Sequence, residues 1–252
     1  MKNIRALFAV TFLPVFLLAL LAPAAASGQQ PEGKIRVLVV TGGHDFEKEP
    51  FFKLFKDNAD ITCQAVEHPK AYALLTADAA KQWDVMVCYD MHQGITDAAK
   101  ADFVARLKEG KGLVVLHHAI ADYQAWPEYT TIIGAHYYLA ATNINGVAKL
   151  RSAYKHGVDF KIHVADTQHP VTLGVKDFDI HDETYKWFDV APECHPLLTT
   201  DEPESNKIIA WAKTYEGARV VYMQCGHDHF AYENPNYQQI LKQAIRWTGH
   251  KS

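Results

Sequence analysis

The chain has 252 residues, of which 48% are hydrophobic and 21% are charged, and its formal net charge at pH 7 is −4. This apolar fraction excludes a disordered chain, and the acidic balance gives no reason to expect a nucleic-acid partner. The length suits one domain, or two small ones, with a sizeable hydrophobic core.

The first segment, residues 1–30, is typical of a secretory signal peptide. It combines a basic start, an apolar run over residues 7–21 and small side chains over residues 22–26 that suit a signal peptidase. The apolar run is short for a membrane span, so we favour cleavage over an uncleaved anchor. We therefore expect an exported protein, periplasmic or extracellular, with no stable membrane anchor after cleavage and a single domain over residues 34–250.

Short apolar runs alternate with amphipathic segments after this leader. The runs are rich in β-branched residues, which is typical of strands buried on both faces. The predicted strands are 35–41, 61–66, 84–89 and 112–116. The predicted helices are 50–58, 76–82 and 96–109. Thr96 should cap the last of these and Gly110 should end it. The alternation indicates βαβ units and a parallel sheet between two helix layers.

The second half of the chain departs from this pattern. Residues 149–164 and 178–190 resemble antiparallel strands, which we interpret as an insertion or edge extension lying over the sheet. Residues 206–215 and 219–225 predict a hairpin, and residues 236–248 predict a closing helix with one apolar face. The fold class expected from these patterns is α/β with an antiparallel insertion.

Four cysteines follow the leader, and no two of them form a CxxC motif. An exported protein could pair them in disulfides. Cys63, Cys88 and Cys225, however, lie within apolar strand-like runs, where buried thiols are common, and Cys194 has no obvious partner. We favour free buried thiols.

Histidines and carboxylates follow several of the predicted strands. They are His44 and Asp45 after the first, Asp90 and His92 after the third, His117 and His118 after the fourth, and His227, Asp228 and His229 after the last. Ligands of an open α/β sheet bind beyond the carboxyl ends of its strands, so we expect one shared pocket. The segment 181–185, with its acids and tyrosine, would complete this pocket if it folds back over the strand ends.

Imidazoles and carboxylates in one pocket suit two kinds of chemistry. A histidine can act as general acid or base near neutral pH, and Glu183 could serve as a base. Three imidazoles could instead hold zinc or another divalent metal, and His44, His118 and His227 are the candidate ligands. The plainer alternative is that each histidine forms an ordinary hydrogen bond in a turn. No HExxH motif, P-loop, GxGxxG or GxSxG is present to decide the question.

An aromatic cluster follows the fourth predicted strand and includes Tyr123 and Trp126. Aromatic rings can stack on the apolar face of a sugar. They can equally pack a loop against the core. Both interpretations remain open at this point.

Five short motifs, taken in order, resemble the ThuA-like (trehalose-utilisation) family of the class I glutamine amidotransferase-like superfamily. They are VTGGHDF at 40–46, GLVVLHHA at 112–119, HPVTLG at 169–174, HDETY at 181–185 and GHDH at 226–229. The resemblance implies a flavodoxin-like three-layer α/β/α sandwich with a mainly parallel sheet. It also implies a place in carbohydrate metabolism, with a sugar, keto-sugar or glycoside as the small-molecule partner.

The superfamily pattern breaks at one informative position. Amidotransferases place a nucleophilic cysteine after the strand that corresponds to 112–116, and here that position falls at His117 or His118. Their catalytic histidine matches His227. The resemblance therefore implies that these histidines face one another, while glutaminase chemistry through a cysteinyl thioester is not expected.

We expect an enzyme of the sugar isomerase, lyase or hydrolase type, because a mere stacking platform does not need the two acids beside His181. The candidate catalytic residues are His117, His118, Glu183, His227 and His229. The candidate substrate-binding residues are Asp45, Tyr123, Trp126, His181, Asp182, Tyr185 and Asp228. The alternatives are a non-catalytic carbohydrate-binding protein on the same scaffold and, after it, a metal-handling or scaffold protein.

Overall fold

A computed structural model of the chain describes residues 33–250. The signal peptide predicted for residues 1–30 lies outside this range. The principal strands are β1 (Ile35–Gly42), β2 (Ile61–Glu67), β3 (Val85–Asp90), β4 (Gly112–Leu116), β8 (Ala153–Val164), β9 (Phe178–Lys186), β11 (His195–Thr199), β12 (Ile208–Tyr215) and β13 (Ala218–Met223). They form a sheet in the order β2-β1-β3-β4-β13-β12-β11-β8-β9. The first five strands in this order are parallel and the rest are antiparallel, which confirms a mainly parallel sheet with an antiparallel extension.

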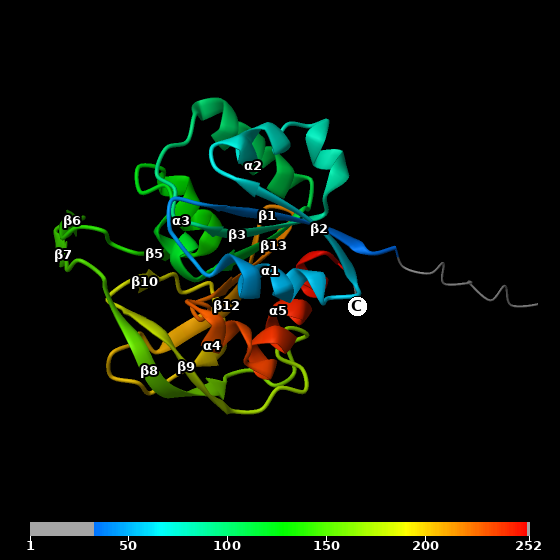
Figure 1. Cartoon of the computed structure of the whole chain (residues 1–252). Helices are drawn as coiled ribbons and strands as arrows, with labels where there is room; N and C mark the ends of the chain where they lie inside the picture. Colours follow the sequence, from blue (N-terminus) through cyan, green and yellow to red (C-terminus); the bar gives the residue numbers. More distant parts are fainter. Residues whose placement is uncertain (1–32, 251–252) are drawn as a thin grey trace, which may run out of the picture. The chain divides into compact units, whose positions relative to one another are not determined.

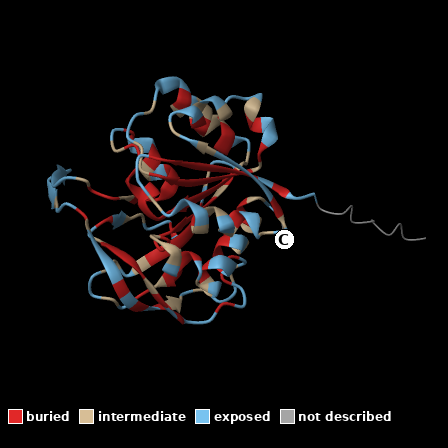
Figure 2. Ribbon diagram, in the orientation of Figure 1, coloured by how far each residue is buried: buried red, intermediate tan, exposed pale blue. Residues whose placement is uncertain are grey.

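Helices cover both faces of the parallel strands (Figure 1). They are α1 (Lys48–Lys56), α2 (Asp97–Lys108), α3 (Pro127–Ile133), α4 (His229–Tyr232) and α5 (Pro235–Thr248). Alternate side chains of β1 explain the three layers, since Val37 and Val39 pack toward α1 and α5 whereas Leu38 and Val40 pack toward α2 and α3. The strands are therefore buried on both faces, as their continuous apolar runs predict (Figure 2).

Short elements complete the connections. They are the 3₁₀ turns η1 (Lys70–Leu74), η2 (Ala79–Gln82) and η3 (His117–Ala121), and the strand pairs β5 (Ala135–His136) with β10 (Asp189–Val190) and β6 (Thr142–Ile144) with β7 (Val147–Lys149). The helix predicted over 76–82 is thus wrong: that range holds one 3₁₀ turn, η2, and η1 precedes it. An α-helix of the seven residues 76–82 is only marginally stable without a full apolar face. A local hydrogen bond stands in this region, in which the indole of Trp83 donates to the carbonyl oxygen of Leu74 at 2.9 Å. The cap predicted for α2 is confirmed, because the Thr96 hydroxyl accepts from the amide of Ala99 at 3.2 Å.

The antiparallel extension is built around the long hairpin of β8 and β9. It joins the rest of the sheet only where Val164 pairs with Leu198 and His163 with Thr199. The expectation of an edge extension is therefore confirmed, but the hairpin continues the sheet from its base instead of lying flat over it. A bulge interrupts the pairing beside Gly157, whose φ is +63°. The other half of the hairpin reaches the carboxyl ends of the parallel strands.

All four cysteines are free, as expected. Cys88, Cys194 and Cys225 are buried, but Cys63 is exposed, which corrects the expectation that it is buried. The reason is its position on β2, which is an edge strand with mostly exposed residues. Over residues 33–250, no helix has the length and apolar character that crossing a membrane requires.

Gly43 permits a close approach of two loops at the carboxyl edge of the sheet. Its φ is +78°, and a Cβ there would overlap the backbone carbonyl of Met91. We expect Gly43→Ala to lower the free energy of unfolding by about 2–4 kcal/mol in urea titrations. Gly146→Ala is the matched control, because its φ is +83° but no atom lies within 4 Å of the added Cβ. Equal losses in both variants would show that the contact with Met91 is unimportant.

Candidate functional site

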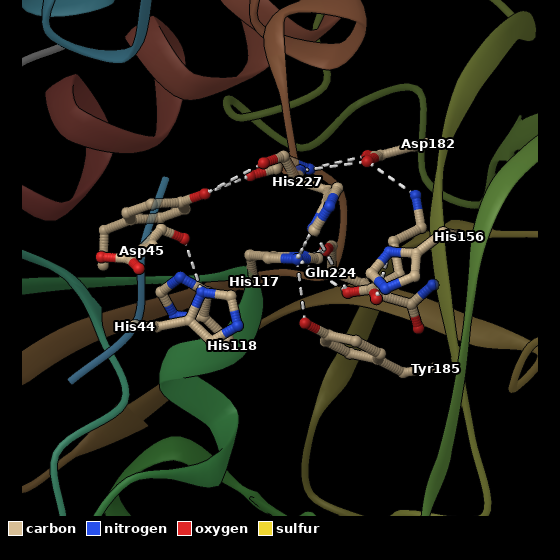
Figure 3. Close-up of polar contacts among 12 residues, drawn as sticks. His44, Asp45, His117, His118, His156, Asp182, Tyr185, Gln224 and His227 are labelled. Carbon is tan, nitrogen blue, oxygen red and sulfur yellow. Dashed lines mark hydrogen bonds and ion pairs between the residues drawn. The ribbon is translucent and has the colours of Figure 1, made fainter. Parts of the chain in front are cut away.

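His117 stands immediately after β4, at the centre of the carboxyl edge of the parallel sheet (Figure 3). Its φ is +51°, a left-handed conformation that costs a non-glycine residue roughly 1–2 kcal/mol. The side chain is fully buried, and its Nδ1 lies 2.7 Å from the backbone carbonyl of Gln224. Because a carbonyl only accepts, Nδ1 carries the proton and Nε2 presents a lone pair in the neutral ring.

Three polar groups converge on Nε2 of His117. The hydroxyl of Tyr185 lies 2.9 Å away, a carboxylate oxygen of Glu183 3.0 Å away, and Nδ1 of His227 3.3 Å away. His117 and His227 come from β4 and the end of β13, whereas Glu183 and Tyr185 come from β9. The expectation that the two histidines face one another is confirmed.

Glu183 lies between two imidazoles. Its second carboxylate oxygen is 2.9 Å from Nδ1 of His156, on β8. Burial acts to raise the pKa of Glu183, but the hydrogen bond from His117 and the charges of the neighbouring imidazoles outweigh it, and the net shift is downward. For His117, burial acts to lower the pKa, yet Glu183 makes the net shift upward. The site therefore holds an ionised carboxylate at neutral pH.

Asp182 ties the hairpin to the end of β13. Its buried carboxylate accepts from the backbone amides of Gly226 at 2.7 Å, His227 at 3.0 Å and Glu183 at 2.8 Å. Burial raises the pKa of Asp182 despite these bonds and the charge of His117. Since its oxygens face backbone amides, this residue positions Glu183 and His227 and has no free oxygen to offer a substrate.

A cavity of about 250 Å³ opens beside this cluster. Its lining includes His44, His118, Tyr137, Arg151, His156, Glu183 and Tyr185. Nδ1 of His118 donates to the carbonyl of Asp90 at 2.9 Å, and its Nε2 is buried with no hydrogen-bond partner among the described residues. Burial holds the pKa of His118 well below its usual value, so the ring is neutral. The cavity thus contains a bare acceptor, and its volume lies slightly below the range of about 300–1,000 Å³ typical of pockets for drug-sized ligands, so it would admit only a small ligand.

A larger surface cavity of about 690 Å³ lies between α3 and the β6–β7 hairpin. The titratable groups in its lining, His136, Lys149 and Asp189, already have partners, and Lys149 pairs with Asp189 at 2.5 Å. His136 bonds the hydroxyl of Thr130 at 2.8 Å, and Asp189 accepts from Tyr138 at 2.6 Å. The cavity beside Glu183 is therefore the better candidate site, despite its smaller volume.

The structure brings some of the predicted site residues together and separates others. His117, Glu183, Tyr185 and His227 form the cluster, and Asp182 supports it. At the cavity, the rings of His44 and His118 lie with centroids 4.5 Å apart, tilted by 31°. The remaining residues lie elsewhere at the rim. His181 bonds the carboxylate of Asp159, His229 bonds that of Glu47, Asp228 caps α4, and Asp45 is exposed.

Tyr123 and Trp126 are not a sugar platform. Both are buried, 4% and 6% exposed, and their ring centroids lie 5.9 Å apart in an edge-to-face contact. Trp126 also packs against Phe103 of α2. Of the two interpretations of this aromatic cluster, core packing of a loop is confirmed, because rings on this side of the sheet fill the space between α2 and α3.

The metal ligands predicted from the sequence are not brought together as a set. Among residues 33–250, one trio of histidine, cysteine or acidic residues has donor atoms that all lie within 4.8 Å of one another: His117, Glu183 and His227. His227 belongs to both the predicted set and this trio. The trio contains His117 and Glu183 where the predicted set has His44 and His118. The reason lies at the end of β4, where consecutive histidines point in different directions: His117 toward β9 and β13, and His118 toward β3.

His156 lies beside Glu183 at the candidate site but was not predicted from the sequence. It does not follow a strand of the parallel sheet, so the strand-end rule could not find it. The available signal was Gly157, since a glycine within a strand pattern often marks a bulge that redirects a neighbouring side chain.

Residues 36–248 match the family model of ThuA, described as trehalose utilisation. Comparison with curated proteins finds no match.

Solved structures similar to this chain include two proteins described as ThuA-like. One, from Parabacteroides merdae ATCC 43184, has a TM-score of 0.71 at 17% identity and covers 86% of this chain and 91% of its own. The other, from Bacteroides uniformis ATCC 8492, has a TM-score of 0.66 at 16% identity and covers 89% of this chain and 95% of its own. A glutamine amidotransferase from Thermotoga maritima has a TM-score of 0.53 at 10% identity and covers 87% of this chain and 100% of its own. Likeness at these identities shows the fold alone.

Proposed function

Because the chain belongs to the ThuA family of trehalose utilisation, we propose that it is an enzyme acting on a sugar, keto-sugar or glycoside in the cavity beside Glu183. The observation that carries this proposal is the placement of Glu183, which lines the cavity and has one carboxylate oxygen 3.0 Å from Nε2 of His117 and the other 2.9 Å from Nδ1 of His156. A carboxylate that orients an imidazole is the arrangement used to move protons in catalysis.

His156 is the group we assign to proton transfer. Nδ1 faces Glu183 and donates to it, which leaves Nε2 as the free base, and this nitrogen has no partner among the described residues. In the reaction, Nε2 would take a proton from a carbon next to the sugar carbonyl, and the electron pair of that C–H bond would move toward the carbonyl oxygen. Transfer of the hydroxyl proton of the deprotonated carbon to the former carbonyl oxygen, with return of the abstracted proton from Nε2 to the former carbonyl carbon, would complete an isomerisation. Expulsion of a leaving group would instead complete a lyase reaction.

The bare acceptor on His118 supports binding of a hydroxylated ligand, because a buried lone pair without a donor costs free energy that a sugar hydroxyl would recover. The non-catalytic alternative rested on the aromatic cluster over residues 123–138; the burial of Tyr123 and Trp126 weakens that support, although Tyr137 of the same cluster lines the cavity. Glutaminase activity is not part of the proposal, since a histidine occupies the position after β4.

The test is proton exchange in D₂O. An aldose, a keto-sugar and a disaccharide would be incubated separately with the protein, and NMR would follow loss of the proton next to the carbonyl and release of any product. We expect exchange or product formation with at least one of these classes. Ligand binding without chemistry would convert the proposal into the carbohydrate-binding alternative, and the absence of both would overturn it.

We also propose that this chemistry takes place outside the cytoplasm. The support is the sequence pattern of residues 1–30 alone. Fractionation of the native cells, with N-terminal sequencing of the protein, tests this: an intact Met1 in the cytoplasmic fraction would refute export.

A further inference from the structure

The contact between His117 and Glu183 is poorly explained by neutral side chains alone. The carbonyl of Gln224 fixes the proton of His117 on Nδ1, so the lone pair of Nε2 faces a carboxylate oxygen 3.0 Å away. Two lone pairs at this separation repel one another unless a positive charge lies between them. A proton on Nε2 would satisfy this one contact. It would leave unexplained why Nδ1 of His227 also turns toward both groups.

The three donor atoms have the mutual spacing of ligands around one ion. Nε2 of His117, the nearer oxygen of Glu183 and Nδ1 of His227 lie 3.0, 3.3 and 3.6 Å from one another. Ligands placed about 2.0–2.1 Å from a tetrahedral metal are about 3.3–3.4 Å apart. The average of the observed spacing is therefore the one that a small divalent ion imposes, without any movement of the chain.

The surroundings also fit a ligand set. The carbonyl of Gln224 on Nδ1 of His117 is the kind of second contact that aims the opposite nitrogen at a metal. His156 holds the other oxygen of Glu183, so the carboxylate is oriented from behind. Of the three, Glu183 lines the adjacent cavity, and the buried, unpartnered Nε2 of His118 in the same cavity could accept from a water or hydroxyl bound to the ion.

We propose that His117, Glu183 and His227 hold one divalent transition-metal ion, with a coordination position open to the cavity. Two imidazoles and one carboxylate suit zinc and ferrous iron better than magnesium or calcium, which prefer all-oxygen sites. For its role in catalysis the inference rests on the proposed function: the ion would bind the sugar carbonyl or hydroxyl oxygen and polarise it. The binding of the ion itself does not depend on the identity of the substrate.

Metal content tests the site directly. Tag-free protein purified without chelator should contain about one equivalent of a transition metal by mass spectrometry. Protein stripped with a chelator should recover thermal stability when Zn²⁺ is added, and Co²⁺ should give the visible absorption of a low-symmetry site. Glu183→Gln and His227→Ala should each weaken metal affinity at least about 10-fold. Glu183→Gln preserves side-chain size, and His227 is partly exposed, so both variants should fold.

His229→Ala is the matched control, because His229 also follows β13 and pairs with a carboxylate, that of Glu47, but lies outside the trio. It should bind metal as the parent protein does. Equal binding by all three variants, or no binding of Zn²⁺ or Co²⁺ by the stripped protein, would overturn the site and leave a proton between His117 and Glu183. Sugar turnover by metal-free protein would overturn the metal's role alone, whereas metal binding without turnover would overturn only the proposed function.

Discussion

Replacement of Glu183 with glutamine should lower sugar turnover about 10²–10⁴-fold while far-UV circular dichroism stays native. The substitution keeps the size of the side chain but removes the charge to which His117 and His156 are bonded. Without the carboxylate, His156 loses the partner that fixes its ring. Rates measured at saturating and at low substrate would show whether kcat or KM carries the loss, and we expect kcat to carry most of it.

Glu47→Gln is the control for this experiment. Glu47 is also a rim glutamate bonded to a histidine, since it accepts from the backbone amide of His229 at 2.7 Å and from its ring at 3.0 Å. It does not line the cavity beside Glu183. Full activity in Glu183→Gln, or an equal loss in both variants, would remove the assignment of the reaction to this cavity.

Loss of the Asp182 carboxylate should give the largest loss of stability among the site variants. Asp182→Ala leaves the amides of Gly226, His227 and Glu183 buried without an acceptor. Each such amide costs about 1–3 kcal/mol, but removal of a buried charge returns part of that amount. We therefore expect the free energy of unfolding to fall by about 2–4 kcal/mol in urea titrations monitored by circular dichroism.

Asp159→Ala provides the comparison on the same hairpin. Asp159 pairs with His181 at 2.7 Å, but its side chain is 87% exposed. Exposed pairs contribute little, so this variant should lose less than about 1 kcal/mol. If Asp182→Ala proves no more costly than Asp159→Ala, the carboxylate is not what anchors the hairpin to the end of β13.

The parallel half of the fold was predictable because the residue pattern of each strand indicates which of its faces are buried. Residues 37–40 and 113–116 are apolar without interruption, so both faces of each strand are apolar, as a sheet covered by two helix layers requires. The strand-end rule then placed His117, His118 and His227 in one region without further information. What it could not supply was the direction of each ring.

Those directions depend on backbone conformation and on the antiparallel strands. The positive φ of His117 turns it away from His118, and no propensity scale foresees this in a histidine. His156 reaches the site from a bulge in β8, 27 residues before its partner Glu183, across a pairing that the sequence does not encode locally. The metal ligands predicted from the sequence therefore include His227 but miss His117 and Glu183, whose donor atoms lie beside it. The sequence could not show that Tyr123 and Trp126 are buried, because stacking on a sugar and packing in a core require the same residue types.

The attachment of the β8–β9 hairpin by Val164 and His163 at its base has a consequence for how this fold can change over evolution. The hairpin brings Glu183, Tyr185 and His156 to the site, whereas the parallel sheet brings the two imidazoles that face them. Substitutions at the polar positions of this one segment would alter three reactive groups together, while its apolar residues Val158, Phe160 and Ile180 keep their places in the core. A few substitutions in the hairpin could therefore change the chemistry of the site while the parallel sheet stays the same.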